Sequence, residues 1–145
     1  MRGYDRALPI ALLRARESTL APFRADLDRI GLTVQQWRVI RALAEGEPRT
    51  AGELSEICVL MPPSLSRIMK ALTERGFIAR VEDGDARRRR VRLTAAGREK
   101  YAEMAERSAE IYARLEAAFG TDRMEALLDL LTELRETSDR LNADD

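Results

Sequence analysis

Four consecutive arginines, Arg87, Arg88, Arg89 and Arg90, make the densest cluster of charge in the sequence. Their mutual repulsion is unfavourable unless solvent or a bound anion relieves it. Guanidinium groups bind phosphate through paired hydrogen bonds, and Asp85 lies where its carboxylate could orient Arg87. A run of this kind is also typical of a solvated charged loop. The cluster is therefore a candidate polyanion site, and its sequence context decides between the two interpretations.

A second group of polar side chains precedes the arginines, in a segment of helical periodicity over about 63–75. One predicted face of this helix is apolar and carries Leu65, Ile68, Met69 and Leu72. The opposite face carries short hydroxyls and long cations, which suit the base edges and phosphates of a DNA major groove. We expect Arg67 to contact a base. The polar set consists of Ser64, Ser66, Arg67, Lys70 and Thr73.

Charge is unevenly distributed along the 145 residues, although Lys plus Arg and Asp plus Glu both total 25. Residues 1–60 hold 9 basic and 8 acidic side chains, residues 61–100 hold 11 and 5, and residues 101–145 hold 5 and 12. The middle segment therefore has a net charge of +6 and the last segment −7. This pattern favours a polyanionic partner that meets the protein at one face.

The sequence has no histidine, and Cys58 is its single cysteine. Ser-His-Asp triads, Cys-His pairs, His-ligated zinc and histidine pH switches are thereby excluded. One cysteine forms neither an intrachain disulfide nor a CxxC metal site, in agreement with a reducing cytoplasm. An enzyme that uses only carboxylates stays formally possible, but no acidic pair and no phosphate-binding glycine loop stands out. We expect no catalytic residue, no metal and no cofactor.

Apolar periodicity and helix-capping residues predict the elements that must position these side chains. Apolar residues at helical spacing run over 4–30, with a kink or a break expected at Pro22. Thr33 and Thr50 each begin a capping box and so predict two further helices before the one at 63–75. Three helices are thus expected in close succession.

After Gly76 the pattern changes from helical to extended. Residues 77–81 and a segment that ends at 91–93 read as two strands of a β-hairpin whose tip carries the arginines. A long helix is predicted from residue 94 to about 119, and a last one from 121 to about 141. The predicted fold class is mainly α with a small β-hairpin, in the order of a winged helix-turn-helix.

We predict one domain over 1–145, with a DNA-binding lobe over 33–93. The helices of 4–30 and 94–141 carry more apolar surface than this lobe can cover, so we expect them to pair two chains across a two-fold axis. A homodimer of this kind reads a pseudo-palindromic site in double-stranded DNA. Its half-sites should lie about 34–36 Å apart, or a multiple of that distance.

Two stretches resemble the signature of the MarR family of bacterial transcriptional regulators. The first is residues 72–80, LTERGFIAR. The second begins with Asp85-Ala86-Arg87 and continues, after three arginines, with residues 91–97, VRLTAAG. The resemblance implies that Asp85 and Arg87 are the Asp-x-Arg of the wing, whose arginine enters the minor groove. It also implies that residues 64–70 belong to the recognition helix and that the end helices form the dimer.

The N-terminal half is similar to one branch of this family, the homoprotocatechuate degradation regulators. The similarity lies at residues 10–17, 32–38 and 58–65. It implies a repressor of an aromatic-catabolism operon, released from DNA by a hydroxyphenylacetate-like acid.

A helical projection independently places Arg16 in the middle of the apolar stripe of residues 4–30. A buried guanidinium requires an anionic partner, because its desolvation is costly. That partner is either a carboxylate of the dimer core or the carboxylate of a small aromatic acid. For the second case Trp37 or a tyrosine could supply the aromatic wall of a pocket.

Two other functions of the same fold stay open. A thiol redox sensor would use Cys58, although this residue precedes the recognition helix. A winged helix used only for protein contacts would not need four arginines at the hairpin tip.

The apolar run near the N-terminus is interrupted by charges and by Pro9. We therefore expect neither a membrane span nor a signal peptide, and a cytoplasmic protein.

Overall fold

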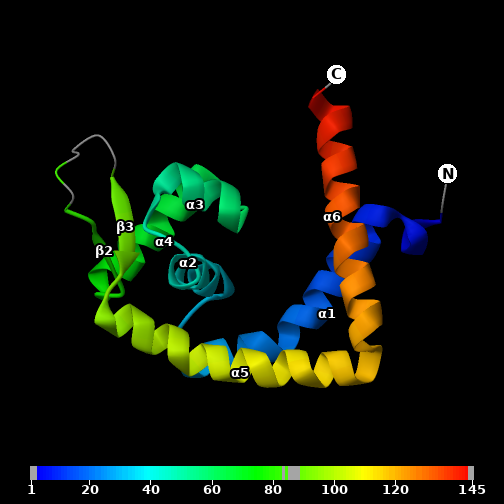
Figure 1. Cartoon of the computed structure of the whole chain (residues 1–145), viewed down its shortest axis with the longest axis horizontal. Helices are drawn as coiled ribbons and strands as arrows, with labels where there is room; N and C mark the ends of the chain where they lie inside the picture. Colours follow the sequence, from blue (N-terminus) through cyan, green and yellow to red (C-terminus); the bar gives the residue numbers. More distant parts are fainter. Residues whose placement is uncertain (1–2, 83, 85–88, 144–145) are drawn as a thin grey trace. The chain divides into compact units, whose positions relative to one another are not determined.

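The computed structural model describes residues 3–82, 84 and 89–143. Its chain divides into two compact units, Met1–Arg107 and Ser108–Asp145. The order of elements confirms the predicted fold class (Figure 1). They are the 3-10 helix η1 (Tyr4–Arg6), α1 (Leu8–Arg29), α2 (Val34–Ala44), β1 (Arg49–Thr50), α3 (Ala51–Cys58), α4 (Pro62–Glu74), β2 (Ile78–Arg80), β3 (Arg90–Leu93), α5 (Ala95–Phe119) and α6 (Thr121–Ala143).

Capping boxes begin α2 and α3, as the sequence predicts. At α2 the Thr33 hydroxyl accepts a hydrogen bond from the Gln36 amide at 3.0 Å. The Gln36 side chain in turn accepts one from the Thr33 amide at 3.1 Å. Thr50 and Glu53 make the same reciprocal pair at α3. Because each box satisfies two backbone N–H groups at a helix start, local sequence fixes where both helices begin.

A tight turn joins α3 to α4. Val59 lies in the left-handed region at φ 52° and ψ 55°, which is unusual for a β-branched residue. The Leu60 amide donates to the Ser55 carbonyl at 3.0 Å, and the Ser55 hydroxyl donates to the Leu60 carbonyl at 2.5 Å. Helix α4 then begins at Pro62, whose missing N–H is tolerated in a first turn. These contacts set the direction in which α4 leaves α3.

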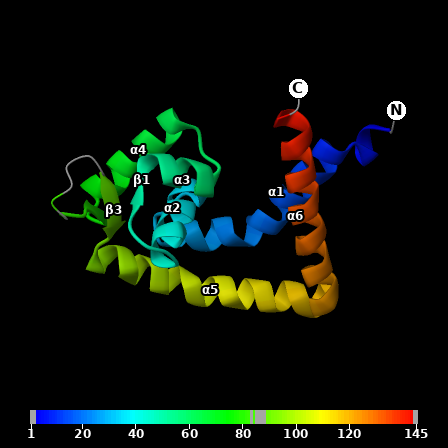
Figure 2. The ribbon, with the colours of Figure 1, turned by 45° about the horizontal axis from the view of Figure 1, so that its top comes forward.

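The sheet has three antiparallel strands in the order β1-β3-β2, one more than the predicted hairpin. Figure 2 labels β1 and β3. β2 and β3 pair in a register that places Ile78 opposite Leu93 and Arg80 opposite Val91. β1 adds to the other edge of β3, with Arg49 opposite Val91. A strand of two residues has too little periodicity to be recognised in a sequence. The hairpin is therefore tied to the chain segment that leads into α3.

Helix α5 begins in close contact with the start of β2. The Thr94 amide donates to the Phe77 carbonyl at 3.0 Å, and the Thr94 hydroxyl donates to the Gly76 carbonyl at 2.5 Å. A Cβ atom at Gly97 would lie 2.1 Å from the Phe77 carbonyl oxygen, so only glycine fits there. The base of the hairpin, where β2 begins and β3 ends, is thus held against the start of α5.

The core of the first unit forms where α2, α3, α4 and the sheet pack together with part of α1 and α5. The sequence predicts a kink or a break at Pro22, but α1 continues through this residue as one helix without a break. Both Pro22 and Ser18, the residue whose carbonyl loses its helical partner, are exposed, so water can satisfy that carbonyl. The fully buried large side chains are Leu27, Ile40, Leu54, Leu65, Leu72, Ile78, Leu93 and Met104.

The second unit consists of the end of α5 and of α6, joined at Gly120 with a φ of 103°. None of the α6 residues is buried. Four of its six leucines are exposed, among them Leu130 at 63% and Leu141 at 65% exposure. Within the described ranges the chain has no helix whose length and apolar character would suit a membrane span.

Candidate nucleic-acid interface

Helix α4 has a buried face and an exposed polar face, as its periodicity predicts. Leu65 and Leu72 are almost completely buried against the core. Ser66, Arg67 and Lys70 are exposed, whereas Ser64 is half-buried. The structure therefore brings four of the predicted DNA contacts together on one helix. They are Ser64, Ser66, Arg67 and Lys70.

The cation of Lys70 is only weakly engaged by the protein. Its ammonium lies 4.0 Å from the Glu74 carboxylate, with side-chain exposures of 78% and 66%. An ion pair at this distance and exposure contributes little to stability. Lys70 is thus available to an external anion at small cost.

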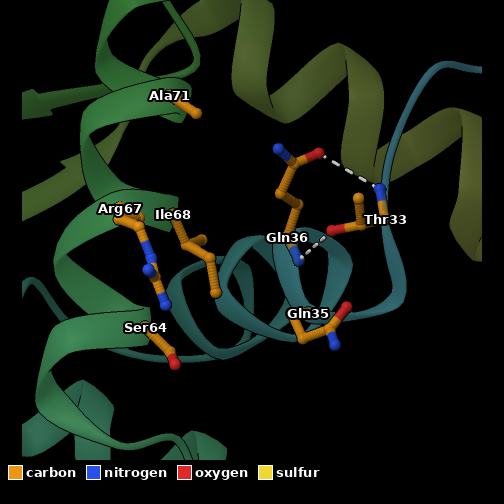
Figure 3. Close-up of a pocket in the computed structure, with 7 residues that line it drawn as sticks. All are labelled: Thr33, Gln35, Gln36, Ser64, Arg67, Ile68 and Ala71. Carbon is orange, nitrogen blue, oxygen red and sulfur yellow. Dashed lines mark hydrogen bonds between the residues drawn. The ribbon is translucent and has the colours of Figure 1, made fainter.

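A groove of about 320 Å³ lies between α4 and the start of α2. Figure 3 shows side chains from both helices along it, with the capping bonds of Thr33 and Gln36 as dashed lines. The sequence did not predict the α2 side of the groove, where Thr33 and Gln36 had indicated only the start of a helix. Its lining consists of Thr33, Gln35, Gln36, Ser64, Arg67, Ile68 and Ala71.

The hairpin carries the second predicted group of contacts. Asp85, Arg87 and Arg88 lie outside the described residues. Arg89 is exposed, and Arg90 is half-buried at the start of β3. The Val81 amide donates to the Arg90 carbonyl at 2.9 Å, which pairs the two strand ends that lead to the tip.

Helix α4 and the hairpin are positioned by the residues that connect them. Gly76 has a φ of 76°, and the Phe77 amide donates to the Leu72 carbonyl at 2.9 Å. The Arg75 guanidinium lies 4.7 Å from the centre of the Phe77 ring and donates to the Gly31 carbonyl at 2.6 Å. These bonds fix the end of α4 to β2 and to the loop before α2. The polar face of α4 and the hairpin therefore have a defined mutual arrangement.

Arg16 is exposed in the single chain, and its expected burial in a dimer core or against a ligand stays a prediction. Its side chain is 49% exposed, and its guanidinium lies 3.0 Å from the Glu17 carboxylate. The apolar stripe around it is also largely exposed, with Leu8 at 48% and Leu12 at 40%. The projection identified the stripe correctly, but this stripe meets the chain's own core only at its end, around Phe23 and Leu27.

Trp37 lies in the core of the first unit. Its ring stacks on Tyr101, with centroids 5.7 Å apart and an interplanar angle of 17°. The residue is only 7% exposed. Neither the groove nor the smaller cavity of about 150 Å³ near Asp26 and Met104 is lined by Arg16 or Trp37. Arg16 and Trp37 therefore stay predicted ligand residues, and these two recesses do not test them.

Cys58 has the surroundings of a structural cysteine. It is fully buried at the end of α3, and its thiol donates to the Arg38 carbonyl at 3.6 Å. Burial raises the pKa of this thiol, an effect that the nearby Arg38 cation partly opposes. Reactive cysteines are exposed and have lowered pKa values. The geometry of Cys58 thus gives no support to a thiol redox sensor.

The described residues also limit metal chemistry. Over 3–82, 84 and 89–143 no three Cys, Asp or Glu side chains are grouped so that they could hold a metal ion. The chemistry that the exposed face of α4 can perform is hydrogen bonding and charge pairing with an anion.

Known proteins match both the sequence and the fold. A model of the MarR family matches residues 30–89. The HTH-type transcriptional regulator FarR of Neisseria gonorrhoeae is 36% identical over 138 residues, which cover 94% of each chain. The homoprotocatechuate degradative operon repressor of Escherichia coli is 34% identical over 128 residues, or 88% of this chain and 86% of that protein.

Solved structures agree with these sequence matches. Ligand-free NadR has a TM-score of 0.86 at 35% identity, with 94% of this chain and 98% of that chain covered. NadR in complex with 4-hydroxyphenylacetate has a TM-score of 0.83 at 34% identity, with 93% and 99% covered.

Proposed function

The chain belongs to the MarR family of transcriptional regulators, and from this premise we propose that it represses transcription by binding a specific DNA sequence as a homodimer. The observation that carries the proposal is the exposed polar face of α4. Ser66, Arg67 and Lys70 lie there without strong partners among the described residues, in a segment with a net charge of +6. An α-helix with such a face fits the major groove. Arg87 to Arg90 of the hairpin would contact the adjacent minor groove, with Asp85 orienting Arg87.

Dimerisation is supported by the apolar side chains that the single chain leaves exposed. They lie on both end segments, with Leu8 and Leu12 on α1 and Leu130 and Leu141 on α6. Exposed apolar surface of this extent is typical of protein interfaces. We place the dimer contacts in 4–30 and 94–141.

Hydroxyl-radical footprinting on the DNA upstream of the protein's own gene tests this proposal. Two protected half-sites about 34–36 Å apart, or a multiple of that, are expected because each protomer presents one α4. Uniform protection along the duplex at every protein concentration would contradict sequence-specific recognition.

We further propose that a small aromatic carboxylate releases the protein from DNA. The relative in Escherichia coli is named as a repressor of homoprotocatechuate degradation, and NadR has been crystallised with 4-hydroxyphenylacetate. In this chain the proposed carboxylate partner is Arg16, with Trp37 as a neighbouring aromatic wall. Dimer formation would cover Arg16 and its apolar stripe, so that the guanidinium gains the buried surroundings that a carboxylate ligand requires.

Isothermal titration calorimetry with 4-hydroxyphenylacetate tests the role of Arg16. Arg16→Ala should abolish the heat of binding, whereas Arg14→Ala should leave it unchanged. Arg14 is a suitable control because it is an exposed arginine of the same helix, paired with Asp5 at 2.8 Å. Equal binding by both variants would exclude Arg16 from the site and leave its Glu17 pair as a surface contact.

A further inference from the structure

We propose that Gln35 of α2 is a DNA-contacting residue that donates hydrogen bonds to a backbone phosphate at the edge of the groove beside α4. The inference rests on the proposed function. It extends the proposed DNA-contact surface beyond α4 and the hairpin to α2, from which the sequence predicted no DNA contact.

The groove places Gln35 within the same recess as the residues of the recognition face. Gln35 lines it from α2, and Ser64 and Arg67 line it from α4 (Figure 3). Gln35 and Arg67 are both exposed, so the recess is open to a partner as large as a duplex. Among its seven lining residues none is acidic, and Arg67 is a cation. The recess therefore suits an anion.

The side chains of the two adjacent glutamines of α2 differ in their hydrogen bonding. The side chain of Gln36 is committed to the capping box, where its oxygen accepts the Thr33 amide hydrogen at 3.1 Å. The side chain of Gln35 has no hydrogen-bond partner among the described residues. Its NH2 group is therefore free to donate to an external acceptor. A glutamine amide donates two hydrogens and adds no charge, which makes it a positioning contact.

A phosphate fits this position better than a base edge does. If the exposed face of α4 lies in the major groove, its own side chains occupy the base edges. A side chain on the neighbouring helix then meets the sugar-phosphate strand that bounds the groove. Contacts of this kind position a protein on DNA and carry little sequence information.

Salt dependence of DNA binding tests the inference directly. Gln35→Lys places one cation at the proposed phosphate, so the slope of log K against log salt concentration should steepen by about 0.9. Asn142→Lys is the control, since it adds the same charge at an exposed site of α6 outside the proposed dimer contacts and should leave the slope unchanged. Circular dichroism should show both variants folded, because Gln35 is exposed and the capping box stays intact.

Gln35→Ala supplies the complementary measurement. It should weaken binding to the upstream duplex and to a scrambled duplex by a similar factor, about fivefold. Specific binding by the wild type with an unchanged slope for Gln35→Lys would overturn the inference and leave the proposed function intact. Loss confined to one base position would also overturn it, in favour of a base contact. A wild type that prefers neither duplex would contradict the proposed function itself, together with the inference built on it.

Discussion

Arg67 and Lys70 share the exposed face of α4, but their side chains differ in what they recognise. The fork of Arg67 can form two hydrogen bonds with a guanine edge, whereas Lys70 is a point charge suited to phosphate. Arg67→Ala should therefore reduce the preference for the specific duplex by about 10- to 100-fold. Lys70→Ala should weaken specific and non-specific binding alike and reduce the salt slope by about 1.

Fluorescence anisotropy with the upstream duplex and a scrambled duplex measures both effects. Arg67→Lys is the informative control, because it keeps the charge and removes the fork. If Arg67→Lys keeps the wild-type preference for the specific duplex, the charge at this position is sufficient for specificity.

Cys58 leads to a second prediction at the scale of a residue. Its thiol is fully buried and its pKa is raised, so little thiolate forms in the folded protein. We expect mild peroxide to leave DNA binding unchanged and Ellman's reagent to react only after unfolding in urea. Loss of DNA binding on peroxide treatment that Cys58→Ala prevents would establish a redox sensor.

The same pKa shift links the stability of the protein to alkaline pH. A raised pKa in the folded state means that the thiol's contribution is fully present below its unfolded pKa of about 8.5. As pH rises above that value the unfolded chain loses its proton first, so the free energy of unfolding falls. Between pH 8 and pH 10, wild type should lose more stability in urea titrations than Cys58→Ala does. Parallel losses would show that Cys58 titrates equally in both states.

At the scale of elements, the start of α5 depends on the absence of a side chain at Gly97. An added Cβ would meet the Phe77 carbonyl oxygen at 2.1 Å, so the backbone of the hairpin or of α5 must move. Gly97→Ala should lower the free energy of unfolding by about 1–3 kcal/mol. Gly52→Ala is the matched control, because its nearest atom would be the Thr50 hydroxyl oxygen at 3.9 Å.

Gly52 lies in α3, where alanine has the higher helix propensity. This second variant should therefore raise the free energy of unfolding by about 0.5 kcal/mol. Urea titrations of both variants separate the local clash from the general effect of adding a methyl group. Equal stabilities would mean that the contact between α5 and β2 relaxes without cost.

The elements that local sequence controls were predictable, and those that tertiary contacts create were not. The capping boxes at Thr33 and Thr50 and the two faces of α4 follow from residues within one or two turns of each other. Strand β1 forms only because β3 offers its edge to Arg49 and Thr50. The groove exists because α2 packs beside α4, so no pattern within 33–36 could reveal it.

At the scale of the whole molecule, the exposed leucines of α6 are the main support for the proposed homodimer. Leu127, Leu130, Leu134 and Leu141 recur at spacings that place them on one helix face. Leu130→Glu should shift the protein from dimer to monomer in analytical ultracentrifugation, because it places two charges in a two-fold interface. Asn142→Glu, at an exposed polar position of the same helix outside the proposed dimer contacts, should stay dimeric.

Leu130 is 63% exposed in the chain, so its replacement removes little from the chain's own packing. A Leu130→Glu variant that is folded and dimeric would place the interface elsewhere. The sequence indicated this surplus of apolar surface correctly. It did not show that Arg16 is exposed in the single chain, because a helical projection does not distinguish a stripe that meets the core from one left exposed.

The most direct test of the central claim is fluorescence anisotropy of the upstream duplex against a scrambled duplex, at one stated salt concentration, with and without 4-hydroxyphenylacetate. A ligand-released repressor should prefer the upstream duplex by about 10³-fold or more and lose that preference when the acid is added. Equal affinity for both duplexes would contradict sequence-specific recognition by α4 and the hairpin. Specific binding that the acid does not change would contradict release by this acid alone.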